Sequence, residues 1–182
     1  MAELVGEMIP NMDLYPVMAD SGGSSDQVVF MHDLIKEHRK PVVIQIYGEW
    51  CPGCVKAAIE FNIMASTYRR RAVFVLINSS GSAGCQKFAQ KLQFVSAIKH
   101  FHQKQLPIEL GLRYIPHTAV LRADGMVVRN YDFSGSTVEK EIQAVIEYQQ
   151  RLVEAEAEAE AAAAAAEPEA EAAAAVAPSE DV

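Results

Sequence analysis

The sequence lacks any apolar run that approaches the roughly 18 residues of a membrane helix, so we expect no membrane partner. Residues 1–20 contain acidic residues but no Lys or Arg. A secretory signal needs a positively charged start, and a mitochondrial presequence needs arginines. These absences lead us to expect a cytoplasmic protein.

Cysteine is scarce, with three in 182 residues, too few and too odd a number for a disulfide scaffold. Two of them, Cys51 and Cys54, form a CxxC motif, which in a reducing compartment indicates redox chemistry or metal binding. A zinc site would need two further ligands. His100 and His102 are two residues apart and would not face each other on a helix. We therefore expect no metal site.

Positive charge is absent from the C-terminus. The chain has 16 basic and 24 acidic residues, and nine of the acidic ones lie in 154–182 together with fifteen alanines and no Lys or Arg. The remaining 153 residues therefore have 16 basic and 15 acidic side chains. A nearly neutral body argues against nucleic-acid binding. We interpret 154–182 as a solvated, low-complexity tail that is either disordered or a projecting helix. Pro168 and Pro178 would limit such a helix. The alternative is an acidic tail that docks to a basic partner.

The hydrophobic pattern predicts three parts: an N-terminal extension (1–23), an α/β domain (24–153) and the tail (154–182). The extension, with Pro10 and Pro16, is expected to pack loosely or to add a short strand. In the domain, continuous β-branched runs predict buried strands, apolar spacings of three and four residues predict helices, and Asp124-Gly125 predicts a hairpin. The expected strands are 42–47, 72–77, 117–121 and a return strand from 126. The expected helices are one capped at Ser24 or Ser25 and ending near Lys40, then 52–68, 85–102, a turn within 106–114, and a last helix with a core stripe from Ile142 to Val153.

Two motifs stand at strand ends. Trp50-Cys51-Pro52-Gly53-Cys54 follows a predicted buried strand, and Tyr114-Ile115-Pro116-His117 precedes the hairpin. Together they resemble the thioredoxin-like family. The resemblance implies a thioredoxin fold, with a central mixed sheet flanked by helices and a cis peptide bond before Pro116. Pro52 is similar to the tryparedoxin and nucleoredoxin relatives, and the long segment 78–115 is typical of the tryparedoxin, nucleoredoxin and cytochrome-maturation branches. Together they are most similar to the tryparedoxin and nucleoredoxin branch.

Only a thiolate attacks a disulfide, and a helix start stabilises an anion. We therefore expect Cys51 to be the attacking thiol and Cys54, one turn into the helix, to be the resolving thiol. Pro52 suits a first helical turn. The resemblance implies that Trp50 covers the site, that Gly53 lies within it, and that Ile115 offers its backbone to an extended substrate beside Pro116.

Three positions have open roles. Gln45 stands where thioredoxin has a buried Asp, which is thought to help deprotonate the resolving thiol, and an amide cannot act as a base. His117 follows the proline where the family has Thr, and either tunes the cysteines or turns away from them. Cys85 is either a regulatory thiol or a buried, incidental one.

The resemblance implies a thiol–disulfide oxidoreductase that acts on protein disulfides and is reduced again by a reductase or a small thiol. Its redox group is the Cys51–Cys54 disulfide, with no other cofactor. The alternative is a binding module that uses the same groove and the tail to dock partners.

Overall fold

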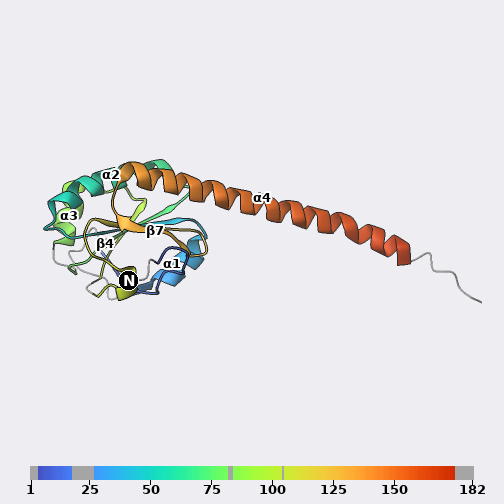
Figure 1. Ribbon diagram of the computed structural model, residues 1–182, viewed down its shortest axis with the longest axis horizontal. Helices are drawn as coiled ribbons and strands as arrows, with labels where there is room; N and C mark the ends of the chain where they lie inside the picture. Colours follow the sequence, from blue (N-terminus) through green and yellow to red (C-terminus); the bar gives the residue numbers. More distant parts are fainter. Residues whose placement is uncertain (1–3, 18–26, 82–83, 104, 175–182) are drawn as a thin grey trace, which may run out of the picture. The chain divides into compact units, whose positions relative to one another are not determined.

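The computed structural model describes residues 4–17, 27–81, 84–103 and 105–174. Within them, the strands form one mixed sheet in the order β2-β1-β5-β4-β3-β6-β7. Figure 1 shows the sheet between the helices that flank it. The central strands β3 (Val42–Tyr47), β4 (Val73–Asn78) and β5 (Ile98–His102) are parallel. The strands β6 (His117–Leu121) and β7 (Val127–Asp132) continue the sheet in antiparallel pairing. The predicted mixed sheet flanked by helices is confirmed.

Alternate side chains of the central strands enter two cores on opposite faces of the sheet. Val43 and Tyr47 of β3 belong to the core covered by α2 (Pro52–Tyr68) and the first turns of α4 (Gly135–Ala174). Val42, Ile44 and Ile46 belong to the core covered by α1 (Met31–His38). Burial on both faces explains the continuous apolar runs of β3 and β4, where each large side chain contributes about 1.5–3 kcal/mol.

The described part of the N-terminal extension joins the core on the α1 side. β1 (Asp13–Pro16) pairs with β5 and with β2 (Val29–Phe30), all in antiparallel fashion. Leu4, Ile9 and Leu14 are buried in this core. The short strand is therefore the arrangement found, and the expectation of loose packing is wrong because these apolar side chains cover a sheet face.

Two predicted helices are shorter than expected. α1 begins only at Met31, because Val29 and Phe30 pair with β1; Ser24 and Ser25 lie outside the described residues. α3 (Cys85–Leu92) ends where Gln93 adopts a left-handed conformation, and residues 98–102, predicted to be helical, form β5. Pairing with β4 prevails there over the helix-like apolar spacing, while a 3₁₀ turn (Ile108–Leu110) falls within the predicted 106–114.

The chain divides into two compact units, Met1–Ile146 and Glu147–Val182. α4 begins in the first unit, where Ile142, Val145 and Ile146 are buried. The remaining members of the predicted stripe, Gln149, Leu152 and Val153, belong to the second unit. The helix reaches Ala174 and therefore passes Pro168, where the sequence had led us to expect a limit. No helix among the described residues is long and apolar enough to cross a membrane.

Candidate active site

Cys51 and Cys54 lie where β3 gives way to α2, at the edge formed by the carboxyl ends of the parallel strands. Cys51 is the N-cap of α2, and its Sγ accepts a hydrogen bond from the Cys54 backbone N–H at 3.3 Å. Pro52 occupies the first turn of this helix, as predicted from its missing N–H. Both cysteines are free thiols; Cys51 retains 8% exposure and Cys54 none. Only Cys51 therefore reaches the surface.

The Ile115-Pro116 segment lies against Cys51, although it is far away in sequence. β6 pairs antiparallel with β3, with Ile46 opposite His117, which brings the residues before β6 beside those after β3. The Ile115–Pro116 peptide bond is cis, as the resemblance implied. The Cys51 thiol donates to the Ile115 carbonyl oxygen across 3.6 Å. A Cβ added to Gly53 would lie 3.7 Å from Pro116 Cδ and 4.0 Å from Cys51 Sγ, so the second helical residue also borders this junction.

Trp50 lies at the surface beside the cysteines. Its side chain is 68% exposed, and its Nε1–H donates to Ser80 Oγ at 3.2 Å. A Cβ on Gly48 would come within 2.9 Å of both Trp50 Nε1 and Ile115 Cδ1. The missing side chain at Gly48 thus lets the indole and Ile115 approach the same stretch of backbone.

Burial sets the chemistry of Cys54. Desolvation, followed by its hydrogen bond with Cys51, raises the pKa of the Cys54 thiol to about 12. A buried thiol of this kind is almost entirely protonated near neutral pH. Its sulfur can attack only after a proton acceptor or a change in its surroundings favours the thiolate.

Gln45 is fully buried, and neither its Nε2 nor its Oε1 has a hydrogen-bond partner among the described residues. It lies between Val43 and Tyr47 on β3, so alternation places it on the sheet face that α2 covers. Its antiparallel neighbour, Thr118, is also fully buried with an unpartnered Oγ1. Three polar atoms without partners thus lie on the central strands beneath the helix that carries Cys54.

His117 and Cys85 both lie away from the thiol pair. His117 pairs with Ile46, which places it on the face that α1 covers, and its Nε2 bonds Asn130 Oδ1 at 2.7 Å. Cys85 begins α3, is fully buried and donates to the Gly81 carbonyl oxygen at 3.0 Å. Burial, as the main cause, raises the pKa of the Cys85 thiol to about 11. The roles of both residues stay predictions.

Two further residues lie near the motif: Asn78, which was not singled out from the sequence, and Tyr114, which was quoted only as part of the second motif. Asn78, at the end of β4, donates from Nδ2 to Glu49 Oε2 at 2.9 Å and accepts at Oδ1 from the Ser80 N–H at 2.6 Å. Tyr114, next to Ile115, is 70% exposed. A polar residue that ends a fully apolar strand, as Asn78 does, is a signal that could have identified the first of these. Within the described ranges, no group of three or more His, Cys, Asp or Glu side chains could hold a metal ion.

The chain matches a known protein family in sequence and known structures in fold. A family model described as the AhpC/TSA family matches residues 5–155. No curated protein matches the chain.

Among solved structures, one similar protein is a Chlorobium tepidum protein assigned as the thiol:disulfide interchange protein DsbE, with 19% identity and a TM-score of 0.63; the match covers 78% of this chain and 97% of that one. A second is the peroxidoxin BcpB of Mycobacterium tuberculosis, with 19% identity and a TM-score of 0.60; the match covers 79% of this chain and 96% of that one. A third is the exposed lipoprotein thioredoxin Etrx1 of Streptococcus pneumoniae, with 14% identity and a TM-score of 0.56; the match covers 73% of this chain and 99% of that one. These likenesses confirm a thioredoxin-like fold, and the family match shows that the chain belongs to the AhpC/TSA family.

Proposed function

We propose that the protein is a thiol–disulfide oxidoreductase that exchanges its Cys51–Cys54 dithiol with disulfides of protein substrates. The observation that carries this proposal is the position of the two thiols. Cys51 caps α2 next to Ile115 and keeps 8% exposure, and Cys54 lies fully buried one turn further on. One thiol is placed to meet a partner, and the other is shielded until the partner is attached.

The proposed reaction has two exchanges. The Cys51 thiolate attacks one sulfur of the substrate disulfide, which forms a mixed disulfide and releases one substrate thiolate. Cys54 loses its proton to solvent or to the released thiolate and attacks Cys51 Sγ. This step forms the Cys51–Cys54 disulfide and releases the second substrate thiolate, so two electrons have moved from the dithiol to the substrate.

The helix start supplies the electrostatic support for the first exchange. Unpaired N–H groups at the N-terminus of α2 favour a negative charge, and the Cys54 N–H already points at Cys51 Sγ. In the reduced protein the Cys51 thiol donates to Ile115 O. An ionised or disulfide-bonded sulfur no longer donates, so this contact is lost when Cys51 reacts.

The substrate would approach as an extended segment beside Ile115, whose backbone offers strand-like pairing. Trp50 directly precedes Cys51 and Tyr114 directly precedes Ile115, and both expose aromatic surface, with 68% and 70% exposure. Aromatic side chains of this kind supply contact area at low cost in conformational entropy. We propose that they form the apolar border of the substrate groove.

The cycle closes when an external reductant attacks the Cys51–Cys54 disulfide. We propose a reductase or a small thiol such as glutathione in that role, in a reducing compartment such as the cytoplasm, with no further cofactor. The placement near the tryparedoxin and nucleoredoxin branch belongs to this proposal and rests on Pro52 and the long segment 78–115. Docking of the acidic tail to a basic partner is a further part of it.

Reduction of a hydroperoxide is the second candidate, favoured by the AhpC/TSA match and by the similar peroxidoxin structure. In that reaction the Cys51 thiolate attacks the O–O bond, becomes a sulfenic acid and releases water or an alcohol. Cys54 then displaces hydroxide from Cys51 Sγ, which leaves the same disulfide and, with the thiol proton, a second water. Both reactions use the same two sulfurs but differ in the oxidant that they consume.

The test compares insulin reduction and hydrogen peroxide consumption, both driven by dithiothreitol, in the wild type and in the Cys51→Ser, Cys54→Ser and Cys85→Ser variants. We expect insulin turnover that is lost in Cys51→Ser and kept in Cys85→Ser, with Cys54→Ser trapped as a mixed disulfide. Peroxide turnover without insulin turnover would favour the second candidate. If neither oxidant is consumed, a binding module becomes the better account.

A further inference from the structure

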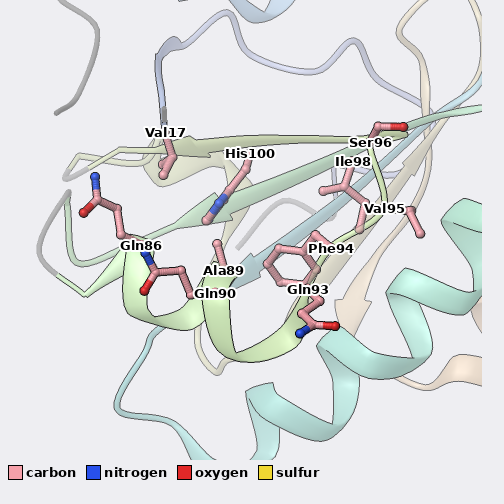
Figure 2. A pocket seen from close by; sticks show the side chains of 10 residues that line it. All are labelled: Val17, Gln86, Ala89, Gln90, Gln93, Phe94, Val95, Ser96, Ile98 and His100. Carbon is pink, nitrogen blue, oxygen red and sulfur yellow. The ribbon is translucent and has the colours of Figure 1, made fainter. Parts of the chain in front are cut away.

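The structure has a cavity of about 330 Å³ between α3 and β5, outside the cysteine motif (Figure 2). We call it the α3–β5 cavity. Figure 2 shows the rings of His100, on β5, and Phe94, after the end of α3, pointing toward Ala89. Small-molecule sites in proteins have volumes of about 300–1,000 Å³ and mostly apolar walls with a few polar groups. The α3–β5 cavity is at the lower end of this range, so a compact ligand would fill it.

The described walls of the α3–β5 cavity carry no net charge. Among its described lining residues there is no Asp, Glu, Lys or Arg. His100 is the only titratable side chain that lines it within the described chain, and burial, assisted by the nearby His102, lowers the pKa of His100 to about 4. The imidazole is therefore neutral at physiological pH. A charged ligand would gain no counter-charge from the described lining, so a neutral ligand is favoured.

Three of the polar side chains that line the cavity are amides. Gln86 and Gln90 lie four residues apart on one face of α3, and Gln93 follows as the left-handed residue that caps the helix. The other polar groups are the hydroxyl of Ser96 and the imidazole of His100. Each amide both donates and accepts hydrogen bonds. A complementary ligand therefore presents groups that do the same, such as an amide, or accept, such as a carbonyl.

The aromatic wall is held in place by contacts behind it. Tyr47 Oη and His100 Nε2 are 2.7 Å apart, and Tyr47 stacks on Phe88 with ring centroids separated by 4.3 Å. Phe94 meets His100 edge to face, with a centroid distance of 5.7 Å. A wall fixed by these contacts needs little reordering when a ligand arrives. Its flat surfaces fit a flat apolar group.

We propose that the α3–β5 cavity binds a small uncharged molecule with a flat apolar body and an amide or carbonyl group at its edge. The proposal is independent of the thiol chemistry, because none of the described lining residues is a cysteine and none belongs to the Trp50–Cys54 motif.

The test uses two probes of the same shape, 2-naphthamide, which is neutral, and 2-naphthoate, which is anionic at pH 7. Binding is followed by amide chemical shifts of the ¹⁵N-labelled full chain and by titration calorimetry. We expect saturable 2-naphthamide binding that shifts the amides of Ala89, Phe94 and Ser96. We expect the Kd of 2-naphthoate to be at least tenfold higher.

Variants that fill the cavity are compared with a control variant that adds the same side chain elsewhere on α3. Ala89→Trp places a ring into it, and Gln90→Trp does so from a more exposed position should the first variant fail to fold. Lys91→Trp adds the same ring to an exposed position of α3 that does not line the cavity. We expect the lining variants to lose 2-naphthamide binding at least tenfold and Lys91→Trp to keep it. Equal binding of both probes, no binding of either, or shifts remote from α3 and β5 would overturn the proposal.

Discussion

The Cys51 thiol and the Ile115 carbonyl oxygen, 64 residues apart in the sequence, are 3.6 Å apart in the structure. The contact joins the start of α2 to the segment that leads into β6. Cys51 keeps 8% exposure, while Cys54 and Cys85 have none. The three thiols of the chain thus differ in access as well as in environment.

We therefore expect a brief pulse of iodoacetamide at pH 7.5 to alkylate Cys51 and to leave Cys54 and Cys85 unmodified. Burial raises the pKa values of the latter two thiols to about 12 and about 11, so neither supplies thiolate at this pH. Peptide mass spectrometry would measure the modification, and protein unfolded in guanidinium, in which all three react, is the control. Early alkylation of Cys54 or Cys85 in the folded protein would contradict this assignment.

Gly48→Ala should displace the indole of Trp50. The added Cβ would lie 2.9 Å from Trp50 Nε1 and from Ile115 Cδ1, both outer atoms of side chains that can move. We expect loss of the bond to Ser80, a changed emission spectrum and a stability loss below about 1.5 kcal/mol. Fluorescence reports this one site because the chain has a single Trp. Ser80→Ala is the control for the bond alone, and an unchanged spectrum in Gly48→Ala would contradict the predicted crowding.

Gln45→Met should leave the free energy of unfolding unchanged or raise it by about 1 kcal/mol. The substitution keeps the length of the side chain and removes two buried polar atoms that have no partner in the described structure. An unsatisfied buried polar group costs about 1–3 kcal/mol. Urea unfolding measures the change, with Thr118→Val as the paired variant on β6. A loss of more than about 1 kcal/mol in Gln45→Met would show instead that the amide has a partner such as a buried water.

The wild type should lose stability relative to His100→Gln as the pH falls from about 6.5 to about 4. Folding lowers the pKa of His100 from 6.5 to about 4, mainly through burial, so the unfolded chain binds more protons in this window. Because the unfolded chain binds more protons, the free energy of unfolding increases with pH. The contribution of His100 to it is fully present above about pH 6.5 and is lost as the pH falls toward 4. The partly exposed ring limits the difference to about 2 kcal/mol. The difference between the two unfolding curves measures it, and parallel pH profiles would contradict it.

The parts of the fold that the sequence predicted well are those whose signal is local. β3 and β4 are continuous apolar runs buried on both faces, and α2 has Pro52 at its start and an apolar pattern to Tyr68. Residues 98–102 were wrongly predicted as helix, because their strand structure depends on pairing with β4, about 24 residues earlier. The spacing of apolar residues within 98–102 contains no information about a strand that is distant in the sequence.

In the candidate site, too, the residues with a local sequence signal could be predicted, and those placed by distant contacts could not. The motif from Trp50 to Cys54 and the segment from Tyr114 to His117 are each contiguous and could be recognised, whereas Asn78 comes near the first motif only through the fold. The position of His117 is another non-local outcome, since its pairing with Ile46 turns it toward the α1 side. Register across β3 and β6, rather than residue type, decides which side chains flank the thiols.

The most direct test of the proposed redox pair is its equilibrium in glutathione buffers, with the Cys51–Cys54 disulfide counted by differential alkylation and mass spectrometry in the Cys85→Ser protein. The account predicts a reversible two-electron transition between about −270 and about −120 mV, the range of dithiols on this fold. It also predicts that Cys54→Ser abolishes the transition and leaves a glutathione adduct on Cys51. A pair that stays reduced across this range, or a transition that requires Cys85, would contradict the central claim.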